Sequence, residues 1–145
     1  MNSDFIKQLE YCNIPLWHTK YKGENINVFC DDVSGNHYQL VKGVVGGLLP
    51  KAKIYSCSLN FETSNEVVKN VNVLCNETKE LMPFEDFIRK YNIRLINNSK
   101  DGGNHDKNSP KAVYLRHIRD KYNLVITGSA GNGYGSPIDN SFYGA

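Results

Sequence analysis

The chain has 145 residues, a formal net charge of +2, 40% hydrophobic residues and 22% charged residues. This length fits a single domain with its own hydrophobic core. Because the net charge is small and no run of Lys and Arg is interleaved with aromatic residues, the composition argues against a nucleic-acid partner. No apolar run approaches membrane-spanning length, and the first twelve residues lack the regions of a signal peptide, so we expect a cytoplasmic protein without a membrane partner.

The four cysteines, Cys12, Cys30, Cys57 and Cys75, form no C-x-x-C pair. No histidine falls at a zinc-type offset from them, so the sequence predicts no metal site. Because Cys30 and Cys57 lie inside apolar runs, we expect them to be small core residues with reduced thiols.

In chain order, the pattern first predicts a helix over residues 4–12 and a strand over residues 26–30 (INVFC), ended by two aspartates. A second helix is predicted over residues 38–47 and ends before Pro50. A second strand follows over residues 53–59.

Residues 60–75 are ambiguous, because Val67, Val68, Val71 and Leu74 fit one helical face whereas the letters NVNVLC alternate as in a strand. Beyond them the chain predicts further elements in alternation: a helix over 84–91, a strand over 93–96, a polar loop over 97–108, a helix over 112–121 and a strand over 124–126.

Strands that alternate with helices predict an α/β fold, a largely parallel sheet with helices on both faces, in one domain over residues 1–145. Ligands of such sheets gather beyond the carboxyl ends of the strands. Here those ends fall at residues 31–32, 58–60, 97–103 and 128–133.

Residues 124–133 (LVITGSAGNG) run from a buried-looking strand into a loop of very small residues that delivers one amide, Asn132. Small residues let a substrate backbone come close, and a fixed amide N–H can stabilise a developing oxyanion. Asp31 and Asp32 lie near His37, and a carboxylate that orients an imidazole is a further part of an acyl-transfer site. Dinucleotide binding is disfavoured, because Ser136 stands where that motif needs its third glycine.

Four segments, taken in order, resemble the subtilisin-like serine peptidases. They are residues 22–32 (KGENINVFCDD), 41–55 (VKGVVGGLLPKAKIY), 93–103 (IRLINNSKDGG) and 125–132 (VITGSAGN). The resemblance implies a truncated domain of this family, with a peptide or protein as substrate or ligand and no cofactor. It matches Asp32, or Asp31 with a shift of one residue, to the catalytic aspartate and Asn132 to the oxyanion donor. The matching cleft-lining and pocket-wall positions are Ser99, Lys100, Gly102, Ser129, Ala130 and Gly131.

The chain departs from the family at the histidine motif, where residues 37–43 read HYQLVKG. In ungapped register Leu40, which cannot accept a proton, takes the catalytic histidine position, and His37 matches a non-catalytic histidine; His37 is the candidate for a replacement base. The family's G-T-S nucleophile segment is absent from the 145 residues. Two functions therefore remain open: a truncated or degenerate peptidase whose nucleophile is supplied elsewhere, and an inactive pseudopeptidase that binds peptides. A sheet edge left uncovered by the truncation is expected to favour association.

Overall fold

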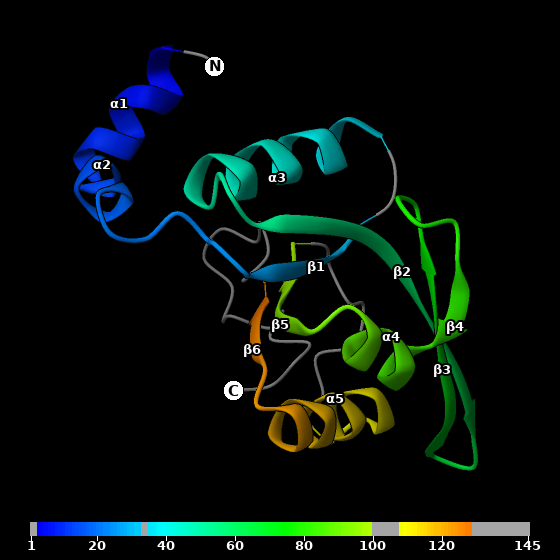
Figure 1. Cartoon of the computed structure of the whole chain (residues 1–145). Coiled ribbons are helices and arrows are strands. Elements are labelled where there is room, and N and C mark those ends of the chain that lie inside the picture. The colour runs from blue at the N-terminus through cyan, green and yellow to red at the C-terminus, as the bar shows by residue number, and fades with distance from the viewer. Residues whose placement is uncertain (1–2, 33–34, 100–107, 129–145) are drawn as a thin grey trace, which may run out of the picture.

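The computed structural model describes residues 3–32, 35–99 and 108–128. These residues build a six-stranded sheet with helices packed on it, and two short helices lie beside it (Figure 1). The elements, in chain order, are α1 (Ser3–Tyr11), α2 (Ile14–His18), β1 (Asn27–Asp31), α3 (Gly35–Leu48), β2 (Lys53–Ser64), β3 (Val67–Cys75), β4 (Leu81–Pro83), α4 (Phe84–Lys90), β5 (Ile93–Asn98), α5 (Pro110–Tyr122) and β6 (Val125–Gly128).

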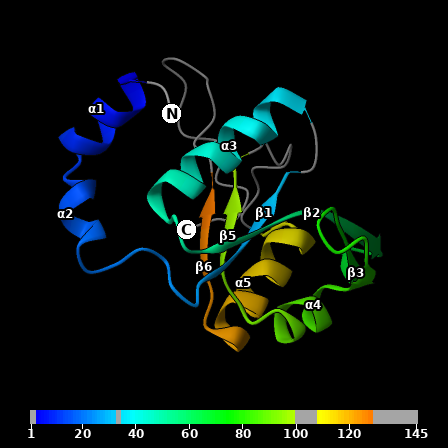
Figure 2. The ribbon, with the colours of Figure 1, turned by 45° about the horizontal axis from the view of Figure 1, so that its top comes forward.

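The fold is α/β, but the sheet is mixed rather than largely parallel as predicted. Its strand order is β4-β3-β2-β1-β5-β6. Strands β2, β1, β5 and β6 pair in parallel, and Figure 2 shows the arrows of β1, β5 and β6 pointing the same way. The pairs β2–β3 and β3–β4 are antiparallel.

The antiparallel part arises because the second predicted strand continues to Ser64 and then reverses in a hairpin. Asn65 and Glu66 both have positive φ, 49° and 60°, as a two-residue type I′ turn requires. Residues 67–75 therefore return as a strand, which is the second of the two alternatives that the sequence left open. The buried residues of β3 are Val71, Val73 and Cys75, in the period of two that a strand dictates.

Helix α3 covers one face of the sheet, and α4 and α5 cover the other (Figures 1 and 2). Helix α5 begins where Ser109 caps it, with its hydroxyl accepting from the Ala112 N–H at 3.3 Å, and Pro110 occupies the first turn. It ends at Asn123, whose φ of 51° stops the helix. Helix α4 carries acidic residues in its first turn and basic residues in its last, which suits the helix dipole.

The main core lies between the sheet and α4 and α5. Phe29 of β1 is fully buried there against Phe84 and Phe87 of α4, with ring centroids 5.4 and 5.8 Å away. Cys30 and Cys57 are fully buried, which confirms their prediction as core residues. Within the described ranges, no helix is both long and apolar enough to cross a membrane.

Candidate functional site

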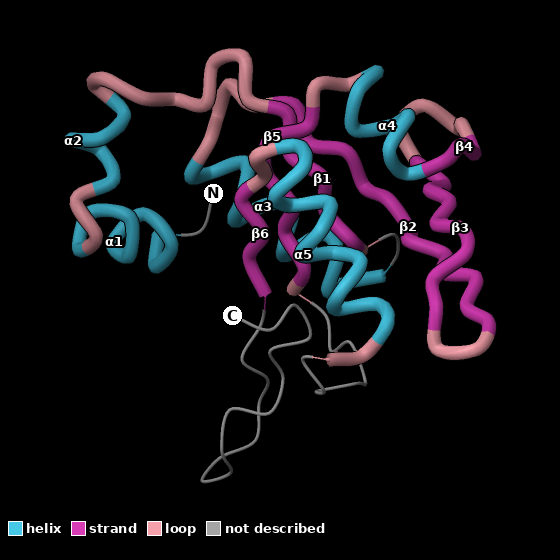
Figure 3. Tube along the Cα trace, turned by 90° about the horizontal axis from the view of Figure 1, so that it is seen from below, coloured by secondary structure: helices cyan, strands magenta, loops and turns pink. Residues whose placement is uncertain are grey.

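The carboxyl ends of β1, β5 and β6 lie at one edge of the sheet. In the parallel register Cys30 pairs with Asn97, and Asn98 pairs with Gly128. Figure 3 shows β5 and β6 ending side by side at this edge. The predicted site positions that follow these strands, Asp32 and Ser99, therefore belong to the same edge.

At this edge the structure brings Asp32 and His37 together. Nδ1 of His37, in the first turn of α3, lies 2.5 Å from Oδ2 of Asp32. A carboxylate only accepts hydrogen bonds, so Nδ1 carries the proton and donates it, and Nε2 is the ring nitrogen outside this bond. The Asp32 side chain is 15% exposed and that of His37 is 58% exposed. The carboxylate is therefore sheltered, whereas the imidazole can be reached from solvent.

The sequence left open whether Asp31 or Asp32, and whether His37 or Leu40, takes part in the site, and these residues differ in their surroundings. Asp31 is buried, and its Oδ1 accepts from the Leu59 N–H at 3.4 Å. Leu40, which takes the catalytic histidine position in ungapped register, is 69% exposed on α3. Asp32 and His37 are therefore the pair that this structure forms.

A second polar group links the ends of β5 and β6. The Thr127 hydroxyl donates to the side-chain oxygen of Asn97 at 3.0 Å, and the Asn97 amide donates to the Ser99 hydroxyl at 2.8 Å. Asn97 and Thr127 are register partners, so their side chains leave the sheet on the same face. The sequence placed Asn97 and Ser99 at a strand end but did not point to Thr127, because only the register between two distant strands reveals the contact of Thr127 with Asn97.

The buried thiols near this edge are poor nucleophiles. Burial raises the pKa of Cys30 to about 11, and the charges of Glu77 and Asp32 add to the effect. Burial and the neighbouring Cys75 thiol also raise the pKa of Cys57. Because the thiolate is the reactive form, both groups stay in the inert thiol form at neutral pH.

Six predicted site residues lie outside the described residues: Asn132, Lys100, Gly102, Ser129, Ala130 and Gly131. Among the residues that are described, no three His, Cys, Asp or Glu side chains are grouped as ligands for a metal ion. Of the predicted site, the structure therefore describes Asp32, His37 and Ser99.

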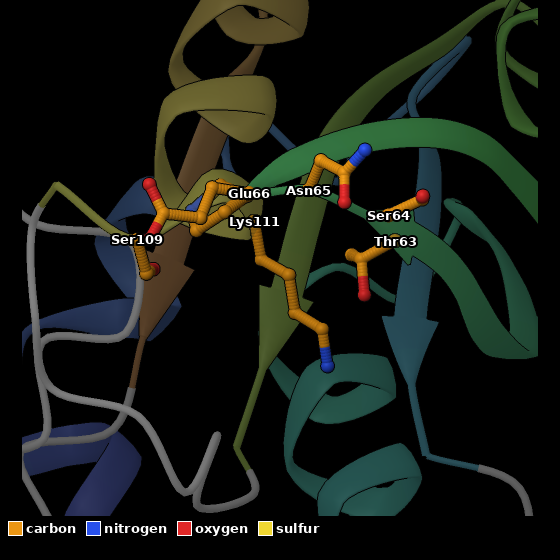
Figure 4. A pocket seen from close by; sticks show the side chains of 7 residues that line it. Thr63, Ser64, Asn65, Glu66, Ser109 and Lys111 are labelled. Atoms are coloured by element: carbon orange, nitrogen blue, oxygen red, sulfur yellow. The ribbon is translucent and has the colours of Figure 1, made fainter.

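A hollow of about 250 Å³ lies between the β2–β3 hairpin tip and the start of α5 (Figure 4). Residues of both elements line it, among them Thr63, Glu66, Ser109 and Lys111. The Lys111 side chain runs along this hollow, and its ammonium lies 5.2 Å from the ring centroid of Phe61. Neither Asp32 nor His37 lines the hollow, so it is separate from the pair at the sheet edge.

Comparison of the chain with protein-family models, with curated proteins and with solved structures found no match.

Proposed function

We propose that this chain is a relative of the subtilisin-like serine peptidases and carries the acid–base half of a peptide-bond hydrolase. The observation that carries the proposal is the 2.5 Å contact of Asp32 with His37 beside the ends of β1, β5 and β6. An aspartate that holds Nδ1 of an imidazole leaves Nε2 to take a proton from a serine hydroxyl.

The parallel part of the sheet supports the proposal. Each of the four segments that resemble the family contains residues of one of the strands β1, β2, β5 and β6. Residues 56–92, which the resemblance does not cover, contain the rest of β2, strands β3 and β4 and helix α4. The antiparallel strands β3 and β4 thus lie in a segment that does not resemble the family.

In the proposed reaction a serine from outside these 145 residues attacks the peptide carbonyl while Nε2 of His37 takes its proton. The C–N bond then breaks, His37 returns the proton to the leaving amine, and water hydrolyses the acyl-serine by the same route. Asp32 keeps the imidazole oriented and stabilises its charged form. By resemblance, Asn132 donates to the oxyanion, and Ser99 lines the peptide cleft.

The test uses a fluorophosphonate probe, which labels activated serines. We expect no labelling of the chain alone. We expect labelling, and hydrolysis of fluorogenic peptides, when the chain is combined with a polypeptide that carries a Gly-Thr-Ser segment from the reading frame after the Ala145 codon or from a neighbouring gene. His37→Ala and Asp32→Asn should each lower the hydrolysis rate by about 10³- to 10⁴-fold, because each removes part of the proton-transfer unit.

The matched control is His117→Ala, an exposed histidine on α5, which should leave the rate unchanged. Labelling of the chain alone would show that the nucleophile lies within the 145 residues. Hydrolysis that survives His37→Ala would exclude His37 as the base.

A pseudopeptidase that binds peptides without cleaving them is the second candidate. Within the described ranges, the hydrogen bond of His37 is with Asp32, and no serine hydroxyl is bonded to it. In this case Ser99→Trp and Gly131→Trp should weaken peptide binding in a titration, because the resemblance assigns both positions to the peptide cleft. Unchanged affinity in both variants would rule out binding in this cleft.

A further inference from the structure

Glu77, in the turn after β3, gathers hydrogen-bond donors from two strands and from α3. Its Oε2 accepts from the Ser56 N–H at 2.7 Å, and its Oε1 accepts from the Ser56 hydroxyl at 2.6 Å. From α3, the Tyr38 hydroxyl donates to Oε1 at 3.3 Å, and the Lys42 ammonium lies 3.7 Å from the same oxygen. The Cys75 thiol lies 3.6 Å from Oε2. One carboxylate therefore ties α3 to β2 and β3.

This carboxylate stays charged beneath the helix. Burial opposes the ionisation of Glu77, but the hydrogen bonds from the Ser56 hydroxyl and amide outweigh it and lower its pKa. The hydroxyl oxygens of Ser56 and Tyr38 also lie next to each other, Ser56 is fully buried and Tyr38 is 7% exposed. Hydrogen bonds to an ionised acceptor are stronger than those between neutral groups, so this cluster holds Tyr38 firmly.

The first turn of α3 rests on Tyr38. Gly35, the first residue of the helix, does not pack closely against the rest of the protein, because a Cβ placed there would meet no atom within 4 Å. Among the described residues of α3, Tyr38 is the buried one. His37 is its neighbour in the chain, so the position of the imidazole follows from where Tyr38 is fixed.

We propose that Glu77 is a positioning residue for His37: through Tyr38 it fixes the first turn of α3, so that Nδ1 meets Asp32. Asp32 holds the imidazole ring, and Glu77 holds the side chain of Tyr38, the next residue in the same helical turn. The catalytic meaning of this role rests on the proposed function, but the geometric role does not.

A purely structural role for Glu77 predicts a different result. The turn that contains it is closed by the Lys79 N–H, which donates to the Cys75 carbonyl at 2.9 Å, and Glu77 could simply stabilise that turn. Loss of Glu77 would then lower the free energy of unfolding but leave the Asp32–His37 contact intact in the folded protein.

The experiment follows the Nδ1–H proton of His37 by NMR in protein labelled with ¹⁵N-histidine, with the signal assigned from a His37→Gln variant. In Tyr38→Phe and in Glu77→Gln we expect the protection of this proton from solvent exchange to fall about two- to tenfold, the range for loss of one intramolecular hydrogen bond. Circular dichroism checks that each variant is folded. If Glu77→Gln does not fold, Tyr38→Phe, which removes a single hydroxyl, decides the question.

The matched control is Glu85→Gln on the opposite face. Glu85 also accepts from a lysine and a tyrosine, Lys121 at 2.6 Å and Tyr122 at 2.5 Å, but it lies on α4. This variant should leave the His37 proton unchanged. Unchanged protection in folded Tyr38→Phe or Glu77→Gln would overturn the proposal. Because the measurement needs neither nucleophile nor substrate, absence of peptidase activity would count against the proposed function alone.

Discussion

The two faces of the sheet are built from different chemistry. On the face of α4, aromatic rings pack against one another: Phe87 lies 5.8 Å from Phe29, 5.7 Å from Tyr55 and 4.6 Å from Tyr91 between ring centroids. On the face of α3, the polar contact between helix and sheet is made by the hydroxyls of Tyr38 and Ser56, which both donate to the carboxylate of Glu77.

We infer that the α4 face mainly stabilises the fold, whereas the polar contact on the α3 face mainly fixes the position of the helix. Burial of apolar area is non-directional and supplies most of the free energy of folding. Hydrogen bonds add less net free energy, but they fix distances and angles. We therefore expect damage to the aromatic face to unfold the protein, and damage to the polar face to displace the Asp32–His37 pair.

The largest effect is expected from Phe87→Ala. Phe87 is fully buried, so the variant should lose about 3–5 kcal/mol of unfolding free energy through lost burial and a cavity, measured by urea titration. Trp17→Ala, an aromatic side chain that is 58% exposed on α2, is the control and should lose less than about 1 kcal/mol. Equal losses in the two variants would contradict the assignment of stability to the α4 face.

Glu77→Gln should have an intermediate effect that depends on pH. Near neutral pH it should lower the unfolding free energy by about 1–3 kcal/mol, because an amide NH2 group replaces one of the two oxygens that accept from Ser56 and the negative charge is lost. The pKa of Glu77 is lowered in the folded state, so its contribution is present above its ordinary value of 4.5 and is lost as the pH falls through the folded pKa. The difference from the parent chain should therefore shrink below about pH 4.5, as urea titrations across pH would measure. A difference that does not change with pH would contradict the charged carboxylate.

The smallest effect is expected from Leu40→Gln. Leu40 is 69% exposed, so the unfolding free energy should change by less than about 0.5 kcal/mol, and the Nδ1–H signal of His37 should remain. Loss of that signal would show that Leu40, and not only the Glu77 cluster, holds the first turn of α3.

The sequence predicted most elements from their periodicity but not the whole sheet. The hairpin escaped prediction because Asn65-Glu66 lacks the glycine that usually marks such a turn, and because the valines of residues 67–74 also fit a helix. Strand β4, of three residues with Pro83 at its end, is too short to show an alternation. Helix α2 was not predicted either: its five residues follow Asn13, which adopts a left-handed conformation with φ of 56°.

The sequence predicted which residue types make up the candidate site, but it did not predict which side chains are in contact. An aspartate at a strand end and a nearby histidine suggested a pair, but the choice between His37 and Leu40 depends on where α3 begins and how it is rotated. Glu77 gave no signal, since its contacts with Ser56 and Tyr38 span 21 and 39 residues and follow from the register of the hairpin.

The contact between Asp32 and His37 joins two residues that are only five positions apart in the chain. The loss of chain entropy on closing so short a loop is small, so this contact can form early, with the strand–helix unit to which both residues belong. The cluster at Glu77 must wait until β3 has paired with β2. The pair thus depends on local chain geometry, whereas its alignment depends on a contact between residues 39 positions apart.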